Sequence, residues 1–509
     1  MNLLKASFSI TVIALVSRLF GLGRDVALVW LFGATLETDA FFAAFAVIYP
    51  AYIVISTSLA SGSVRFMTTL TPSEGEERGR HFLSIAMNLT ALGMLVLAGA
   101  LVVGADTIAQ GLAGRGNAAL ASRIETTLLF LAPAGVLMGL SGILAGYLQY
   151  RLQFVRAALA PAVLNLSILA LTIGLGGWLG VQAAVAGALA GAVLLFAMQL
   201  PSLNALPFKQ VWSLRLHRVL VAEFFAPVSK IILSALLLYA FVFVDLALAA
   251  GLGEGKVTVF SIASKFIQLP QGMIAIGVTV SAFPVIAGLL QSRQDAAAGD
   301  IIAKVNSGIL LLSMIAASGL FAVGDAALTA LFRGTLSAAA QQDAARILLG
   351  LTLTIPALAL NTFIVRVSFA QGQFLLPVAL IFGGLMVKAL AGFALVGLAD
   401  LHVFALSSAL GLYAVTLALM LSLGRGLPEL FNGVFWFSTA RMTICALAIT
   451  LSAAVLDRTI PPQAALLEAS MVGLWVLVLW SAALALFFRP QMRGLLDLRR
   501  IKTAQSDPV

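Results

Sequence analysis

The chain has 509 residues, of which 61% are apolar and only 10% are charged. A soluble protein of this size carries about a quarter charged residues, so the composition excludes an ordinary soluble protein. Apolar runs of about 20 residues or more recur from end to end, which predicts an all-α, polytopic membrane protein.

The apolar segments predict about 14 transmembrane helices. The first six lie at 6–33, 38–65, 82–105, 125–149, 158–179 and 181–200. Eight more lie at 223–250, 257–291, 305–324, 346–370, 375–399, 402–423, 435–456 and 465–488. The N-terminal stretch "MNLLKASFSITVIALVSRLF" is interpreted as a retained first helix, because its apolar run contains charges and no clear small-residue cleavage site.

A polar break divides these segments into two sets. It predicts an N-terminal six-helix lobe (1–202), a cytoplasmic linker (203–222), a C-terminal six-helix lobe (223–424), two additional transmembrane helices (425–488) and a basic cytoplasmic tail (489–509). "AFFAAFAVIYP" (40–50) and "VFSIASKFIQLP" (259–270) echo each other weakly. Repeated halves of this kind are typical of transporters with a central cavity between two lobes.

The basic residues are distributed as membrane topology requires. With a cytoplasmic N-terminus, about 16 lysines and arginines fall on the cytoplasmic side against about 6 on the other. Both termini are therefore predicted to be cytoplasmic, and the tail is expected to lie along the anionic lipid surface. This accounts for the net charge of +9, so we expect the lipid bilayer and no nucleic acid as a partner.

Metal and cofactor chemistry are not indicated. The single cysteine, Cys445, excludes a disulfide framework. His81, His217 and His402 are far apart in the sequence and near predicted helix ends. We expect no metal, no cofactor and no catalytic residues.

Several charges nevertheless lie inside predicted membrane segments, where each costs roughly 2.5–3.5 kcal/mol on insertion scales. They are Arg18, Arg24, Asp25, Asp39, Lys230, Asp245, Lys265, Arg366 and Lys388. Arg65, Arg441 and Glu468 lie nearer helix ends, where they can snorkel to the interface. Most of the buried charges are cations on several helices, which suits a cavity for an anionic substrate, and arginine suits phosphate through its planar donor fork.

Two alternatives remain open for these charges. Each can be one half of a buried ion pair, such as Arg24 with Asp39, or an interfacial side chain. Asp245 can bind sodium or a proton and couple transport to an ion gradient, or it can neutralise Lys230 or Lys265.

The stretch "SRLFGLGRDVALVWLFGATLETDAFFAAF" (17–45) resembles the opening of the MurJ/MviN family, the lipid II flippases of bacterial peptidoglycan synthesis. "YLQYRLQFVRAALAPAVLN" (147–165), "QLP" (199–201) and "SKFIQLPQGM" (264–273) are also similar to that family. It belongs to the multidrug/oligosaccharidyl-lipid/polysaccharide exporter superfamily. The resemblance implies a polytopic bacterial inner-membrane transporter, not an enzyme, with two six-helix lobes that alternate between inward and outward openings.

The same resemblance implies a set of site residues. Arg18, Arg24, Asp39 and Lys265 would bind substrate, with the two arginines holding the diphosphate of a polyprenyl-linked saccharide. Asp25 or Asp39 would hold the arginines in place, and Asp25, Asp245 and Arg366 would have supporting or ion-coupling roles. Transport would draw on a sodium or proton gradient or on the membrane potential, alongside proteins of cell-wall or polysaccharide synthesis.

The chain departs from the family pattern in three places. The family's second helix carries an arginine pair and then "AEGAF", whereas this chain reads "PAYIVISTSLASGSV" (50–64). Lys265 stands where the family has an arginine, and the basic loop between helices 10 and 11 is shortened to "FAQGQFLLP" (369–377). The substrate therefore stays open between lipid II and another lipid-linked glycan for an exopolysaccharide or surface polymer.

The sequence is compatible with three further classes to different degrees. A cation-coupled drug exporter of the same superfamily would more commonly have an acidic cavity. A membrane glycosyltransferase would need a polar catalytic loop, and neither "TPSEGEERGR" nor "RGTLSAAAQQDAAR" contains a convincing site. In a scaffold, the buried charges would only pair, and Arg18→Ala would leave transport unaltered.

Overall fold

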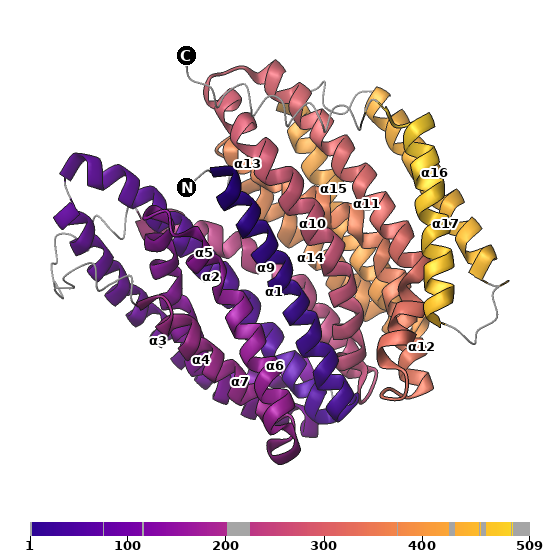
Figure 1. The fold of residues 1–509 in the computed structure, drawn as a ribbon, viewed down its shortest axis with the longest axis horizontal. Helices are drawn as coiled ribbons and strands as arrows, with labels where there is room; N and C mark the ends of the chain where they lie inside the picture. The colour runs from indigo at the N-terminus through magenta and orange to yellow at the C-terminus, as the bar shows by residue number, and fades with distance from the viewer. Residues whose placement is uncertain are drawn as a thin grey trace. The chain divides into compact units, whose positions relative to one another are not determined.

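The computed structural model describes residues 3–74, 76–114, 117–200, 224–373, 375–426, 433–457, 459, 465–489 and 491. Within these ranges every regular element is a helix (Figure 1). The first half contains α1 (Leu3–Phe32), α2 (Leu36–Glu74), α3 (Glu76–Ala113), α4 (Ala118–Tyr150), α5 (Phe154–Ala158), α6 (Ala160–Leu179), α7 (Gln182–Ala197) and α9 (Ala226–Gly251). The second contains α10 (Lys256–Gln291), α11 (Asp295–Phe332), α12 (Ala338–Leu351), η3 (Thr352–Thr354), α13 (Ile355–Ala370), α14 (Leu375–Ala399), α15 (His402–Gly426), α16 (Gly433–Asp457) and α17 (Ala465–Leu486).

Every predicted apolar segment falls on helical residues, and the all-α membrane fold is confirmed. The segment predicted at 346–370 is not a single helix, because it covers the end of α12, η3 and α13. Ten helices of the described residues are long and apolar enough to cross a membrane, and two shorter apolar helices, Gln182–Ala197 and Tyr239–Gly251, add to them. The number of 14 spans stays a prediction. Several helices also run past the predicted apolar segments, as α2 does to Glu74 and α12 does by beginning at Ala338.

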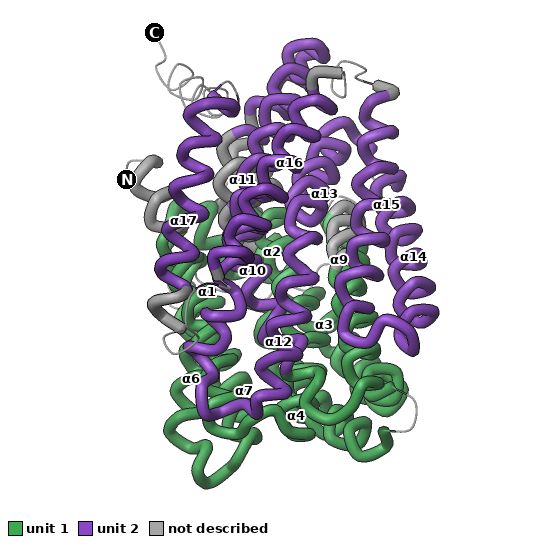
Figure 2. The backbone as a smooth tube through the Cα atoms, turned by 90° about the vertical axis from the view of Figure 1, so that its right-hand side faces the viewer, with its two compact units in different colours: residues 1–258 green, residues 259–509 purple. Residues whose placement is uncertain are grey.

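The chain forms two compact units, residues 1–258 and residues 259–509 (Figure 2). By this division α9 belongs to unit 1, together with the first turn of α10. The predicted lobes, with a boundary after the sixth helix, stay a prediction. The predicted linker at 203–222 lies outside the described residues, as does the tail at 489–509 except for residues 489 and 491.

Close approach of α2 and α4 organises unit 1. Small residues face each other along this pair: a Cβ on Gly142 would lie 2.7 Å from the Cα of Ser56, and one on Gly146 would lie 2.6 Å from the carbonyl oxygen of Ala60. In a membrane, where lipid is as apolar as leucine, such backbone contact is a main source of helix association. The "STSLASGS" stretch of α2 therefore has a packing role.

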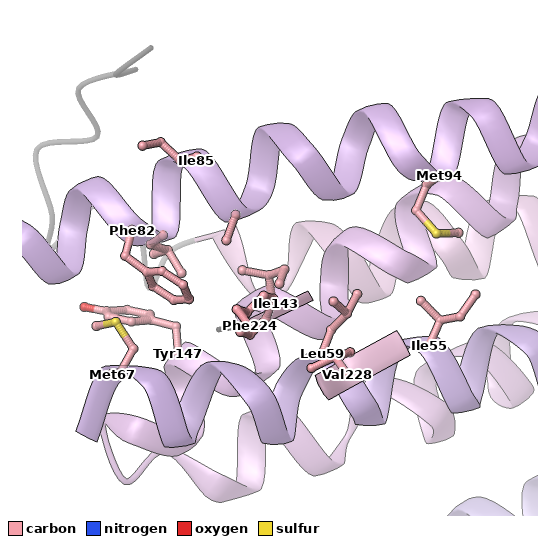
Figure 3. Close-up of a cluster of buried hydrophobic side chains, with 12 residues drawn as sticks. Ile55, Leu59, Met67, Phe82, Ile85, Met94, Ile143, Tyr147, Phe224 and Val228 are labelled. Carbon is pink, nitrogen blue, oxygen red and sulfur yellow. The ribbon is translucent and has the colours of Figure 1, made fainter. Parts of the chain in front are cut away.

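An apolar cluster covers one end of this helix pair. Met67, Phe82, Tyr147 and Phe224 are among its buried members, contributed by α2, α3, α4 and the residues just before α9 (Figure 3). The rings of Phe82 and Phe224 meet edge to face with centroids 5.5 Å apart, a favoured aromatic geometry.

Replacing Gly146 by alanine should destabilise unit 1 by about 1–3 kcal/mol, because α2 backbone stands where the new methyl group would go. Thermal unfolding of the purified protein in detergent measures the effect. Gly135→Ala is the matched control on the same helix, since a Cβ there meets nothing within 4 Å. Equal melting temperatures for the two variants would contradict the packing role of Gly146.

Unit 2 repeats this kind of packing between α14 and α15. A Cβ on Gly384 would meet a methyl group of Val415 and would lie 2.8 Å from the carbonyl oxygen of Gly411. The last two helices, α16 and α17, pack against α11. There the indole N–H of Trp480 donates to the hydroxyl of Ser318 over 2.7 Å, so the polar tip of a buried tryptophan is satisfied across α11 and α17.

Candidate functional site

The central feature of unit 1 is a buried arginine on α1. Arg24 is only 1% exposed. Its Nε donates to Oδ1 of Asp25 over 2.7 Å, and its Nη2 lies 2.6 Å from the same oxygen. Such a pair is far less costly in a membrane than either charge alone. Of the two carboxylates expected to hold the arginines, Asp25 is the one paired with Arg24.

Two further contacts fix the guanidinium. Its Nη1 donates to Oδ1 of Asn165, on α6, over 3.0 Å. Its central carbon lies 4.4 Å from the ring centroid of Phe45, which is the geometry of a cation–π contact. Polar groups therefore hold the guanidinium at its edges and an aromatic ring covers its face.

Phe45 belongs to a row of rings on one face of α2. Phe41, Phe45 and Tyr49 recur every fourth residue, so they stack along the helix with centroids 5.4 and 4.9 Å apart. Tyr52 continues the row, with its centroid 6.3 Å from that of Tyr49. Aromatic rings thus line one side of α2, and Phe45 is the ring of this row that covers Arg24.

Arg18 lies on α1, about 1.7 turns before Arg24. It is half-buried, and it lies within electrostatic range of Tyr49 and of Tyr239 on α9. Unit 1 therefore gathers Arg18, Arg24 and Asp25 with two tyrosines.

Asp39 has a different setting. It is fully buried, and its Oδ2 accepts a hydrogen bond from the backbone N–H of Gly255 over 2.6 Å. Its Oδ1 accepts from the backbone N–H of Thr258 over 2.7 Å and from the hydroxyl of Thr258 over 2.6 Å. The carboxylate thus caps the first turn of α10, where free N–H groups and the helix dipole favour negative charge. Among the residues that the structure describes, its partners are these groups and not an arginine.

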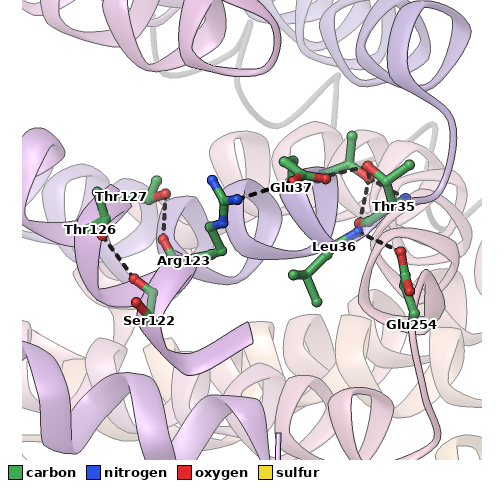
Figure 4. Close-up of polar contacts among 9 residues, drawn as sticks. Thr35, Leu36, Glu37, Ser122, Arg123, Thr126, Thr127 and Glu254 are labelled. Carbon is green, nitrogen blue, oxygen red and sulfur yellow. Dashed lines mark hydrogen bonds and ion pairs between the residues drawn. The ribbon is translucent and has the colours of Figure 1, made fainter. Parts of the chain in front are cut away.

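Neighbouring contacts hold the same end of unit 1 together (Figure 4). Glu254 accepts a hydrogen bond from the backbone N–H of Leu36 over 3.2 Å. On the other side of α2, Glu37 lies 3.7 Å from Arg123 of α4, and both side chains are about half exposed. Gly255 has φ +80°, and a Cβ there would lie 2.8 Å from the carbonyl oxygen of Ala34, so this turn needs glycine.

The remaining candidates are spread over both units. Asp245 is buried in α9 of unit 1. In unit 2, Lys265 is half-buried in α10, Lys388 is buried in α14 and Arg366 is exposed on α13. The side chains of Lys230, Arg65 and Glu468 lie outside the described residues. The substrate-binding and ion-coupling roles of all these residues stay predictions, as does the cavity between the lobes.

Within the described ranges, no three His, Cys, Asp or Glu side chains gather closely enough to hold a metal ion. The expectation that the chain has no metal and no cofactor stays a prediction.

Comparison with known proteins shows the family to which the chain belongs. The family model described as "Lipid II flippase MurJ" matches residues 28–468, which is most of the chain. The chain belongs to the MurJ family.

Individual relatives agree with that assignment. The lipid II flippase MurJ of Burkholderia cenocepacia is 24% identical over 336 residues, which cover 64% of this chain and 64% of that protein. A probable lipid II flippase MurJ of Bdellovibrio bacteriovorus is 27% identical over 376 residues, or 68% of each chain. The solved structure of a lipid II flippase MurJ in an inward closed conformation has a TM-score of 0.77 at 20% identity, covering 95% of this chain and 99% of that one, so the fold is shared.

Asn165 and Phe45 are the site residues that sequence reasoning missed. Both lie in stretches used to recognise the MurJ family, "APAVLN" and "TDAFFAAF". A search limited to charges passes over an uncharged amide, although Asn165 is a polar residue in an otherwise apolar membrane segment. That polarity was the available signal.

Proposed function

We propose that this chain is a transporter that moves a polyprenyl-diphosphate-linked saccharide, lipid II first among the candidates, from the cytoplasmic to the outer leaflet by alternating access. Membership of the MurJ family supports the class of function. The observation in the site that carries the proposal is the arginine of α1, held by Asp25 and Asn165 inside an apolar segment. A planar guanidinium suits the oxygens of a diphosphate.

The mechanism follows from charge. A substrate can shift a conformational equilibrium only if it binds the two states with different affinity. An anionic head group that neutralises the repulsion between Arg18 and Arg24 would favour the state in which both can reach it. Release outside would follow when the lobes separate those cations from the diphosphate.

A second glycan substrate is favoured by a specific observation. Where the resemblance implies an arginine pair on the second helix, residues 50–64 of this chain contain Tyr52, the last ring of the aromatic row of α2, and small residues packed against α4. A site with fewer cations and more rings suits a different head group. We therefore keep another lipid-linked glycan, for an exopolysaccharide or surface polymer, as the alternative.

Complementation tests the choice of substrate. A host bacterium depleted of its own lipid II flippase should survive when this chain is expressed at normal membrane abundance. If the chain is present and folded in the membrane but does not restore growth, lipid II is excluded and the alternative glycan becomes the lead.

We place the protein in the bacterial inner membrane with both termini cytoplasmic, on the basis of the distribution of lysine and arginine. Reporter fusions at each end test this, and a periplasmic signal from either end would contradict it. Association with proteins of cell-wall or polysaccharide synthesis is part of the same proposal, and cross-linking in the host followed by identification of the captured proteins tests it.

Coupling to a sodium or proton gradient, or to the membrane potential, remains part of the proposal. Asp245 supports it, because a carboxylate buried in a membrane helix is costly and such residues commonly serve transport. Transport measured in vesicles should fall when ionophores collapse the gradient that drives it. Undiminished transport after collapse of the sodium gradient, the proton gradient and the membrane potential would overturn the coupling.

A further inference from the structure

We infer that Asn165 is a positioning residue that sets the orientation of the Arg24 guanidinium for a diphosphate. This inference rests on the proposed function and deepens it. Asn165 lies on the buried face of α6, the helix that packs beside α1, and is itself 3% exposed. No charge marks it in the sequence, yet it contacts α1 at two points.

Both ends of the amide are used. Its Oδ1 accepts from Nη1 of Arg24 over 3.0 Å, and its Nδ2 donates to the backbone carbonyl of Ser17 over 3.3 Å. The arginine side chain can only donate and a carbonyl can only accept. A side chain that bonds both Arg24 and the carbonyl of Ser17 must therefore offer one acceptor and one donor side by side, as the amide of Asn165 does. A carboxylate would repel the Ser17 carbonyl, and an apolar side chain would serve neither group.

Helix geometry explains how one amide spans this length of α1. Ser17 and Arg24 are about two helical turns apart, and side chains on a helix lean toward its N-terminus, so the arginine reaches back toward Ser17. Gly21 lies between them, and a Cβ there would stand 3.4 Å from Nδ2 of Asn165. The absence of a side chain at Gly21 therefore leaves room for the amide against α1.

The bonds leave Arg24 with donors to spare. A guanidinium has five N–H groups. Within the described part of the chain, hydrogen bonds occupy Nε–H and one N–H of Nη1, and Nη2 forms the ion pair with Asp25 and so uses one of its two N–H groups. One N–H on each terminal nitrogen remains, and two such donors in one plane match two oxygens of a diphosphate. Because Arg24 is 1% exposed, a ligand reaches them only after a neighbouring side chain or helix moves.

Asn165 thus fixes the plane of the guanidinium from one side while Asp25 fixes it from the other. Without Asn165, Arg24 keeps its charge and its pairing with Asp25, but it can rotate about that pair. Attraction for any anion should survive this change. What should be lost is the preference for a ligand that presents two phosphate groups at a fixed spacing.

The test uses the full-length protein in nanodiscs with two probes, a polyprenyl diphosphate and the polyprenyl monophosphate of the same chain length. Asn165→Leu should weaken diphosphate binding by about tenfold, the effect of one charge-assisted hydrogen bond, and should change monophosphate binding much less. A general loss of structure would weaken both by the same factor.

Asn361→Leu is the matched control. Asn361 is also buried and also bridges two helices: its Nδ2 donates to the carbonyl of Leu412, and its Oδ1 accepts from Thr416. This variant removes interhelical hydrogen bonds of the same kind in unit 2, so it should lower the melting temperature to a similar degree while leaving the diphosphate preference unchanged.

The outcomes are distinguishable. If the parent protein shows no preference for diphosphate, the proposed function fails before Asn165 is at issue. If the parent shows the preference and Asn165→Leu keeps it, the positioning role is wrong and the proposed function stands. Loss of the preference in Asn165→Leu but not in Asn361→Leu supports the inference.

Discussion

Arg24→Ala should abolish rescue of a flippase-depleted host, and it should also destabilise the protein. The substitution removes the guanidinium proposed to bind the diphosphate. It also takes from Asp25, 1% exposed, the cation 2.6 Å away. Removing one partner of a buried ion pair typically costs about 3–5 kcal/mol, so a lower yield in the membrane is expected as well.

A second variant separates these two effects. Arg24→Ala combined with Asp25→Ala removes both charges, so much of the lost thermal stability should return because no carboxylate is left buried without its cation. Rescue should not return, since the donor fork is still missing. Growth restored by the double variant would show that Arg24 serves folding alone.

Arg24→Lys adds a finer comparison. Lysine keeps the positive charge but offers a point charge in place of the planar fork, and it cannot bond Asp25 and Asn165 in the same way. Partial or no rescue is therefore expected at equal membrane abundance. Arg123→Ala is the control: its ion pair with Glu37 spans 3.7 Å between half-exposed side chains, so both stability and rescue should stay near those of the parent.

Hydropathy predicted where the helices lie because burial in lipid demands long apolar runs, but it predicted their ends less well. The polar residues after Arg65 continue α2 to Glu74, and the "AAAQQDAAR" stretch forms the start of α12. The alanine, glutamine and arginine residues of the α12 stretch are good helix formers outside the hydrocarbon. Hydropathy reports the membrane-embedded part of a helix, and propensity and capping decide the rest.

The cost of charge in a membrane left two roles open for Arg24, a buried ion pair or a cavity cation, and the pair named as an example was Arg24 with Asp39. The structure instead pairs Arg24 with Asp25 and Asn165. The same cost could not predict the setting of Asp39. The groups that Asp39 binds lie more than two hundred residues away, at Gly255 just before α10 and at Thr258 in its first turn. The contact between Asp39 and these groups depends on how α2 and α9 pack, which a local sequence pattern does not predict.

The second large effect is the loss of stability expected when the carboxylate of Asp39 is removed. Asp39→Leu should destabilise the protein by about 3 kcal/mol or more, because three donors at the start of α10 lose their acceptor in a buried place. Asp39→Asn should cost less, about 1–3 kcal/mol, since the amide oxygen can still serve Thr258. Its NH₂ group would then face the N–H of Gly255, donor against donor.

Thermal unfolding of a graded series of variants tests whether the carboxylate of Asp39 holds the start of α10. Thr258→Val removes only the hydroxyl bond and should cost about 1 kcal/mol, so the expected order of melting temperatures is parent, Thr258→Val, Asp39→Asn and then Asp39→Leu. Asp300→Ala is the control, because its carboxylate is 62% exposed and pairs with Lys304 on the surface, where such pairs contribute about 0–1 kcal/mol. If Asp39→Leu and Asp300→Ala have the same melting temperature, the carboxylate of Asp39 does not hold the start of α10. If Asp39→Leu melts far lower, Asp39 is required to fix the turn from which the chain enters unit 2, and its loss should reduce transport even while Arg18 and Arg24 are intact.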